Sequence, residues 1–221
     1  MYLTILLPCL NESETLEECI NEIKSCTRGI NHEILVVDNG SSDDSDKIAL
    51  ANGCRVVYES NKGYGSALIT GIRESLGEYI IMLDCDCSYK LENINEFITL
   101  FNNGYDFICG NRFKGGICKG AMPLSHRLGV PILSKIAKLK YKVPINDFHC
   151  GLRGFKRGIF ESTDFTSTGM EFATEIIALA SKKANKICEV GIKLYKDKRS
   201  GSSHLSTVKD GFRHLGYILL H

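Results

Sequence analysis

The first 110 residues alternate between short apolar runs and segments with a single apolar face, and this order constrains the fold most. Apolar runs typical of buried strands lie near residues 2–7, 33–37, 55–58, 79–83 and 105–109. Between them, segments such as 11–23 carry apolar residues every three or four positions, which predicts amphipathic helices. Strands that alternate with helices form a parallel sheet with right-handed crossovers. The sequence therefore predicts an α/β fold with a mostly parallel central sheet flanked by helices and a Rossmann-like N-terminal half.

The second half of the chain is less regular, but no linker separates it from the first. Helices are predicted at about 126–140 and 170–184, a strand at 187–194, and an amphipathic helix over the last residues. A loop rich in glycine and lysine is predicted at 114–120. We therefore expect one domain over residues 1–221, in which residues 1–110 form a nucleotide-binding half.

Composition and motif searches exclude several classes of function. The net charge is +1 and no basic run is present, which argues against nucleic-acid binding. No G-x-G-x-x-G follows the first strand and no phosphate-binding P-loop motif occurs anywhere, which argues against a dinucleotide site and a P-loop. No apolar run approaches the roughly 20 residues that a membrane span needs.

The ten cysteines indicate reduced, mostly buried thiols in a cytoplasmic protein, because no basic-plus-apolar signal segment opens the sequence. A zinc site is not expected, because Cys85 and Cys87 have no second ligand pair at zinc spacing.

A pair of carboxylates, Asp84 and Asp86, comes directly after the apolar run at 79–83. Side chains at i and i+2 of a strand point the same way, so both can converge at the carboxyl edge of the sheet, where α/β proteins bind ligands. Their hard oxygens suit Mg²⁺ or Mn²⁺, which would carry a diphosphate. Most isolated Asp-x-Asp pairs are solvated turn residues, so the other loops of the crevice, 8–12 and 38–44, must support this hypothesis.

A series of short motifs, in the right order along nearly the whole chain, carries a family resemblance. They lie at residues 7–12, 36–43, 62–65, 84–89, 110–113, 147–153, 169–172 and 199–205. The chain resembles the family 2 glycosyltransferases with the glycosyltransferase A fold, and is most similar to the branch that makes polyprenyl-phosphate sugars, such as dolichyl-phosphate mannose or glucose synthases. The resemblance implies a nucleotide-sugar-binding half at 1–110 and an acceptor-binding half at 111–221.

The resemblance also implies roles for residues on the donor side. Asp84 and Asp86 would hold the ribose and the metal-bound diphosphate, and Asp38 would receive hydrogen bonds from the nucleotide unless it only caps a helix. Arg199 and Ser203 belong to a loop that folds over the diphosphate in the family. The remaining donor-side residues are Pro8, Leu10 and Glu12 for the base and ribose, Cys85 within the acidic motif, and Ser88 as a further ligand.

On the acceptor side, Arg112 and Arg127 match positions that bind the acceptor phosphate, and arginine forks suit phosphate. Asp147 matches an acceptor-side aspartate that orients the acceptor or acts as a base, so that Asp86, Asp147 and Arg112 form the expected catalytic set. Arg153 and Glu171 also match, with a buried structural ion pair as the alternative to catalysis.

The sequence departs from the family pattern at three places. His204 stands where relatives often have lysine, Lys90 and Leu91 stand where proline is common, and the chain ends at His221 without the transmembrane helices of many polyprenyl-phosphate enzymes. We therefore expect peripheral contact with the cytoplasmic face of a membrane, pairing with a separate membrane subunit, or an acceptor that is not a lipid.

The leading hypothesis is an inverting, metal-dependent glycosyltransferase that moves a hexose from a UDP- or GDP-linked sugar to polyprenyl phosphate. A family 2 enzyme that acts on a soluble sugar, peptide or small-molecule hydroxyl is the alternative. A nucleotide-sugar-binding regulator and a nucleotidyltransferase remain as further readings, disfavoured by the intact acidic pair and by the missing basic glycine-rich signature respectively.

Overall fold

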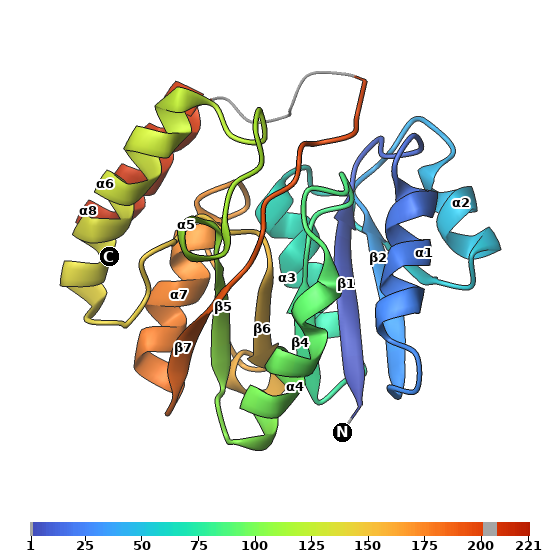
Figure 1. Cartoon of the computed structure of the whole chain (residues 1–221), viewed down its shortest axis with the longest axis horizontal. Helices are drawn as coiled ribbons and strands as arrows, with labels where there is room; N and C mark the ends of the chain where they lie inside the picture. Colours follow the sequence, from blue (N-terminus) through green and yellow to red (C-terminus); the bar gives the residue numbers. More distant parts are fainter. Residues whose placement is uncertain (1, 201–206) are drawn as a thin grey trace.

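The computed structural model describes residues 2–200 and 207–221, with side chains from residue 211 onward in the last helix. Its described part is built on a seven-stranded sheet in the order β3-β2-β1-β4-β6-β5-β7 (Figure 1). The strands are β1 (Leu3–Cys9), β2 (His32–Asp38), β3 (Arg55–Tyr58), β4 (Tyr79–Met82), β5 (Phe107–Asn111), β6 (Arg153–Lys156) and β7 (Ile187–Gly191). All neighbouring pairs are parallel except those of β6, which runs antiparallel to β4 and β5.

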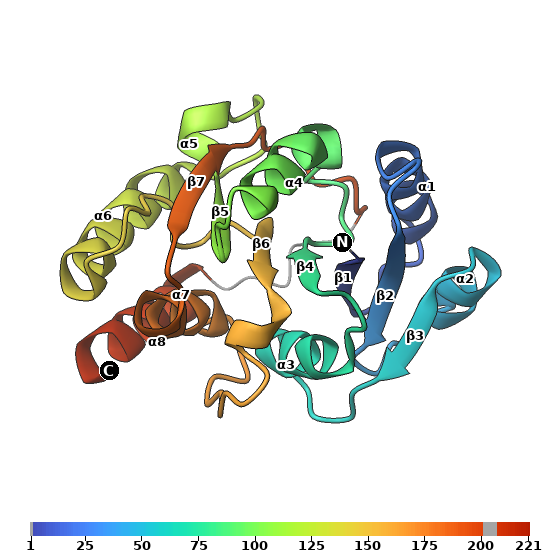
Figure 2. The same cartoon turned by 90° about the horizontal axis from the view of Figure 1, so that it is seen from below.

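Helices cover both faces of the sheet. Figure 2 shows α1 and α4 on one face and α3, α7 and α8 on the other. The helices are α1 (Leu16–Cys26), α2 (Ser45–Ala51), α3 (Tyr64–Glu74), α4 (Ile94–Asn102), α5 (Arg112–Gly115), α6 (Leu124–Tyr141), α7 (Phe172–Lys183) and α8 (Thr207–Leu220), with short 3₁₀ turns at Leu91–Asn93 and Arg157–Ile159. The prediction of a mostly parallel α/β sheet is confirmed.

The apolar residues that predicted the strands and helices are mostly buried in the core. The side chains of β1 at Leu3, Ile5, Leu6 and Leu7 are completely buried, as expected for a parallel strand covered on both faces. Helix α3 packs on this strand so closely that a Cβ on Gly71 would lie 2.2 Å from Leu6. All ten cysteines are free thiols, and seven of them are buried.

Strand β6 is the main element that sequence reasoning missed. Its sequence, Arg-Gly-Phe-Lys, has no apolar run and carries a glycine, so it lacks the signals of a strand. Gly154 is needed here because a Cβ would lie 2.7 Å from the ring of Phe97. The strand at 187–194 is also shorter than predicted, since β7 ends at Gly191. In the described part of the chain, no helix is both long and apolar enough to cross a bilayer.

Candidate active site

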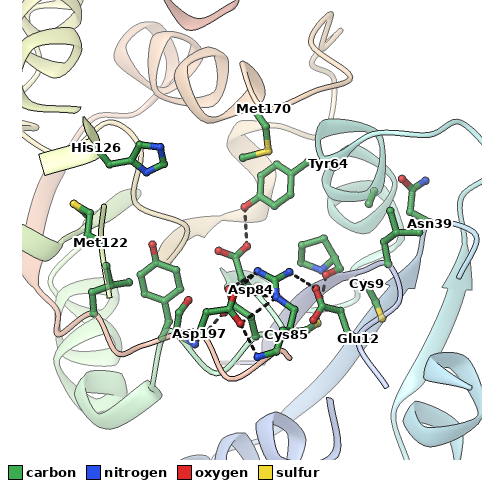
Figure 3. A pocket seen from close by; sticks show the side chains of 18 of the residues that line it. Cys9, Glu12, Asn39, Tyr64, Asp84, Cys85, Met122, His126, Met170 and Asp197 are labelled. Carbon is green, nitrogen blue, oxygen red and sulfur yellow. Dashed lines mark hydrogen bonds and ion pairs between the residues drawn. The ribbon is translucent and has the colours of Figure 1, made fainter. Parts of the chain in front are cut away.

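A cavity of about 620 Å³ lies at the carboxyl edge of the sheet. The three polar loops predicted to share a crevice all contribute to it, since Glu12, Asn39 and Asp84 line the same space. Figure 3 shows Asp84, Glu12 and Asp197 in the middle of the cavity, with His126 and Met122 toward one end and Asn39 toward the other. The lining also includes Pro8, Leu10, Tyr64, Cys85, Asp86, Ser88, Arg112, Met170, Arg199 and Arg213.

The acidic pair follows β4 and points into this cavity. Asp84 accepts a hydrogen bond from the Tyr64 hydroxyl at 3.1 Å. Asp86 accepts one from the backbone N–H of Ser88 at 2.9 Å, which fixes its carboxylate within the turn. Both aspartates are therefore held in place by neighbouring groups, and both line the space that a ligand would fill.

The guanidinium of Arg199 lies among the carboxylates of this cavity. Its Nη1 is 2.9 Å from Glu12 Oε1, and its Nη2 is 3.2 Å from Asp86 Oδ2 and 2.5 Å from Asp197 Oδ2. These three carboxylates come from distant parts of the sequence and surround one cation. Asp84 lines the same cavity, and the other two arginines of the lining, Arg112 and Arg213, are paired with Asp147 and Glu171. A further cation would therefore balance the remaining negative charge.

Two carboxyl groups of the site have raised pKa values. Burial, followed by the charge of Asp86, raises the pKa of Asp84 to about 7. Burial likewise raises the pKa of Glu12 to about 7, although the charge of Arg199 opposes this shift. Such values are common where like charges are held together for a ligand, and a bound cation would favour the ionised forms.

The donor set fits a divalent metal that shares its ligands with a substrate. Within residues 2–200 and 211–221, no three His, Cys, Asp or Glu side chains form a ready-made metal cage. Mg²⁺ is usually bound by one or two carboxylates and completed by substrate phosphates and water, and Mn²⁺ suits the same oxygen ligands. Asp84 and Asp86 supply such a pair, and Arg199 shows that a positive group is accommodated beside Asp86.

Two glycines allow α3 to present Tyr64 to this site. A Cβ on Gly65 or Gly63 would lie 2.2 Å or 2.1 Å from a carbonyl oxygen of the 167–168 backbone. Gly63 also has a φ of 140°, a conformation that favours glycine. The helix start therefore meets that backbone directly, and the tyrosine between the glycines reaches Asp84.

Arg112 and Asp147 form a buried ion pair next to the cavity. Arg112 Nε donates to Asp147 Oδ2 and Nη2 donates to Oδ1, both at 2.7 Å, and the Arg112 backbone N–H donates to Oδ2 at 3.1 Å. The Asp147 side chain is fully buried, whereas Arg112 lines the cavity. Arg112 also lines a second, smaller pocket of about 370 Å³ together with Arg127, Phe113 and Ile117. The structure thus brings the two predicted phosphate-binding arginines to one place.

Some residues predicted from the sequence lie away from the main cavity. Asp38 accepts hydrogen bonds from the backbone N–H groups of Gly40 and Ser41 at 3.0 and 3.1 Å, so it shapes its own loop. Arg127 reaches only the second pocket, and Asp147 lies behind Arg112. Ser203 falls outside the described residues.

The buried ion-pair alternative for Arg153 is wrong, because its guanidinium donates instead to the backbone oxygens of Cys150, Ala173 and Phe148. Glu171 instead pairs with Arg213 at 3.0 Å.

Sequence reasoning missed several residues that line the cavity. Tyr64 stands inside the motif at 62–65, and Asp197 precedes Arg199 by two positions. The motifs could therefore have been used to predict both residues as part of the site. Met170 likewise stands inside the motif at 169–172, whereas Arg213 lies in no motif and carries no signal that would have pointed to the site.

Comparisons with known proteins identify the family. The model of the glycosyl transferase family 2 matches residues 4–163. The low-salt glycan biosynthesis hexosyltransferase Agl6 of Haloferax volcanii is 35% identical over 99% of this chain, which spans only 53% of that protein. A dolichyl-phosphate hexose transferase of the same organism is 28% identical, with 95% of this chain and 89% of that protein covered.

A solved structure shares the fold. Glucosyl-3-phosphoglycerate synthase from Mycobacterium tuberculosis, in complex with Mn²⁺, UDP and glucosyl-3-phosphoglycerate, superposes with a TM-score of 0.77 at 20% identity, covering 99% of this chain and 78% of that one. The expected resemblance is confirmed, and the central sheet is that of the glycosyltransferase A fold. The chain belongs to the family 2 glycosyltransferases.

Proposed function

We propose that this chain transfers a hexose from a UDP- or GDP-linked sugar to a polyprenyl phosphate, with inversion at the anomeric carbon and with Mg²⁺ or Mn²⁺ bound. The observation that carries the proposal is the cavity in which Asp84, Asp86 and Arg199 meet and which Arg112 also lines. The relative named dolichyl-phosphate hexose transferase supports the acceptor, and the solved neighbour with Mn²⁺ and UDP supports the donor and the metal.

On the donor side, the cavity wall at Pro8, Leu10 and Glu12 is assigned to the base and ribose. Asp84 and Asp86 would hold the metal ion, which when bound neutralises charge on the diphosphate leaving group. Arg199 is assigned to a diphosphate oxygen. Once a metal ion balances the charge of the surrounding carboxylates, the guanidinium can donate hydrogen bonds to phosphate.

The rest of the donor side is assigned around this centre. Ser203 belongs to the same segment of the sequence as Arg199, and Cys85 and Ser88 complete the acidic turn. Asp38 acts indirectly, by shaping the loop whose Asn39 lines the cavity.

On the acceptor side, Arg112 and Arg127 are assigned to the acceptor phosphate. A phosphate monoester is already largely ionised at neutral pH, so it needs cations to hold it more than it needs a base. Asp147 is assigned to positioning, since both of its oxygens are bound to Arg112 and the side chain has no exposed surface. A lipid acceptor places the enzyme at a membrane, which we propose is the cytoplasmic face, alone or with a membrane subunit.

A donor screen tests this function. Purified protein is incubated with labelled UDP-glucose or GDP-mannose, polyprenyl phosphate and Mn²⁺, and the product is extracted as lipid, with its anomeric configuration reporting inversion. Asp86→Asn is expected to lower turnover by about 100-fold or more, and EDTA to abolish it, because charge stabilisation worth several kcal/mol is lost. Asp44→Asn, at an exposed surface position, is the matched control and should keep full activity.

Two outcomes would contradict the proposal. Full activity in EDTA or in the Asp86→Asn variant would remove the metal from the mechanism. Transfer to a soluble hydroxyl acceptor and never to polyprenyl phosphate, with both donors, would replace the lipid acceptor by the soluble one.

A further inference from the structure

Helix α6 carries an apolar stripe that faces away from the protein. Leu124, Leu128, Ile132 and Leu139 are 76, 71, 61 and 71% exposed, and Ile136 is 38% exposed. At 3.6 residues per turn, these five side chains fall within a sector of about 120°. A helix on the surface of a globular protein normally places its apolar residues toward the core, so this stripe has the opposite orientation.

The buried face of the same helix lies on the other side. Ser134, Ala137 and Tyr141 are its buried residues. On the helical wheel their sector is centred roughly opposite the exposed stripe. The exposed apolar side chains therefore do not contribute to the packing of α6 onto the domain. A contiguous apolar patch of this kind marks an interaction surface.

The charges of α6 are all positive. The helix contains Arg127, Lys135, Lys138 and Lys140 and no aspartate or glutamate. Lys135 falls within the apolar sector, and the other three lie along its two borders. An apolar stripe bordered by cations is the pattern of a helix that lies in the plane of an anionic lipid surface.

The neighbouring helix α8 supports the position of this surface. Figures 1 and 2 show α6 and α8 together at the end of the molecule farthest from β3. Lys140 Nζ donates to the backbone oxygens of Ile218 and Leu219, which ties the ends of the two helices together. Leu219 and Leu220 are 68 and 82% exposed, so α8 adds apolar surface at this end of the molecule.

The stripe begins at the mouth of the active-site cavity. Pro123 and His126, on either side of Leu124, line that cavity. Arg127, on the next turn, lines the pocket that it shares with Arg112. A surface that covers the N-terminal end of α6 would therefore meet both the cavity and the two arginines.

We propose that the α6 stripe, formed by Leu124, Leu128, Ile132, Ile136 and Leu139, is an interfacial membrane-docking surface that inserts into an anionic bilayer. An 18-residue helix is about 27 Å long and would lie along the bilayer plane, with Lys135 at the headgroups. This inference extends the proposed function by naming where a lipid acceptor is met. It is carried by the exposure and charge of α6 alone.

Flotation with liposomes tests this surface without donor or acceptor. The full chain is mixed with vesicles of phosphatidylcholine and phosphatidylglycerol in a 3:1 ratio and centrifuged through a density gradient. The wild type is expected to float. A variant with Leu128→Ser, Ile132→Ser and Leu139→Ser should bind at least about 1,000-fold more weakly, because each lost side chain contributes roughly a tenfold factor or more when it is buried in lipid.

Matched variants control for fold and for charge. Leu50→Ser with Leu76→Ser removes side chains that are 55 and 62% exposed elsewhere on the surface, and it should float like the wild type. Lys135→Gln should weaken binding to the anionic vesicles about fivefold and leave binding to pure phosphatidylcholine unchanged. Thermal unfolding of every variant shows that its fold is intact.

Three results would overturn the inference. The first is a wild type that stays with the soluble fraction, and the second is a triple variant that floats like the wild type. The third is a wild-type dimer in sedimentation velocity that the triple variant makes monomeric without any flotation, which would assign the stripe to a second copy of the chain. Flotation without sugar transfer to polyprenyl phosphate would leave the docking surface standing and overturn only the proposed function.

Discussion

Replacing Asp147 with asparagine removes one charge from a buried ion pair and keeps the shape of the side chain. The carboxylate is fully buried and receives three hydrogen bonds from Arg112, of which two join the side chains at 2.7 Å. The Arg112 side chain itself is only 10% exposed, so water in the cavity that it lines can replace the lost partner only in part. Removing one member of a buried pair costs roughly 3–5 kcal/mol, because the other charge is left uncompensated.

Asparagine retains one oxygen acceptor, so we expect the lower end of this range, about 3 kcal/mol. For a chain of this size, 1 kcal/mol shifts the melting temperature by about 2–4 °C, so Asp147→Asn should melt about 6–12 °C below the wild type. Calorimetry or circular dichroism measures this shift. Asp44→Asn is the control, because its ion pair with Lys47 is 70–76% exposed and such pairs contribute about 1 kcal/mol or less.

Kinetics separate a positioning role from a role as general base. If Asp147 positions Arg112, the variant should raise KM for the acceptor more than it lowers kcat, since the guanidinium loses its fixed orientation. An unchanged melting temperature together with a large loss of kcat and a normal KM would refute this reasoning. That result would mean that the carboxylate reaches the acceptor directly.

Two further predictions concern the charged and titrating groups around the cavity. Arg199→Ala should bind Mn²⁺ at least about fivefold more tightly in the absence of donor, because the substitution removes a cation that competes for the carboxylates. The same variant should turn over more slowly. Calorimetric titration with Mn²⁺ measures the affinity, and weaker binding than in the wild type would contradict the prediction. Burial lowers the pKa of His149 well below 6.5 and that of His214 to about 4. The contribution of these neutral rings to the free energy of unfolding is therefore complete above pH 6.5. It is lost as the pH falls below 6.5, by up to about 1.4 kcal/mol per pH unit for each ring. Urea unfolding at a series of pH values should therefore show a shallower loss of stability on acidification for His149→Phe than for the wild type. The raised pKa values of Glu12 and Asp84 act with the opposite sign, but both groups are present in the two proteins, so the difference between the curves reports on the histidine. Parallel curves would contradict the prediction.

The parts of the fold that follow from local pattern could be predicted from the sequence. The apolar run of β1 and the spacing of Leu16, Cys19, Ile20 and Ile23 in α1 report burial directly, and the structure buries them all. The i, i+2 argument for Asp84 and Asp86 also depends only on strand geometry, and the two side chains do line one cavity. These inferences need no knowledge of distant contacts.

The contacts between distant segments could not be predicted in this way. The pairing of Arg112 with Asp147 spans 35 positions and arises because the chain returns along β6, a strand with no sequence signal of its own. The contact of Arg199 with Glu12 spans 187 positions. The outward orientation of the α6 stripe was also hidden, because periodicity shows that a helix has an apolar face but does not show which way the face points.

The position of β6 has a consequence for the order in which the chain can assemble during synthesis. In the described part of the chain, strand β5 pairs with β6 and β7 alone, and both are made after it. A nascent chain that has emerged only to residue 111 therefore holds the finished strand β5 without a partner, and β4 keeps an open edge until Arg153–Lys156 arrives. The two halves of the domain serve different substrates in the proposed function, yet we expect them to fold as one unit. A ribosome-bound fragment that ends near residue 110 should be sensitive to protease, and protection should appear only after β7 has left the exit tunnel.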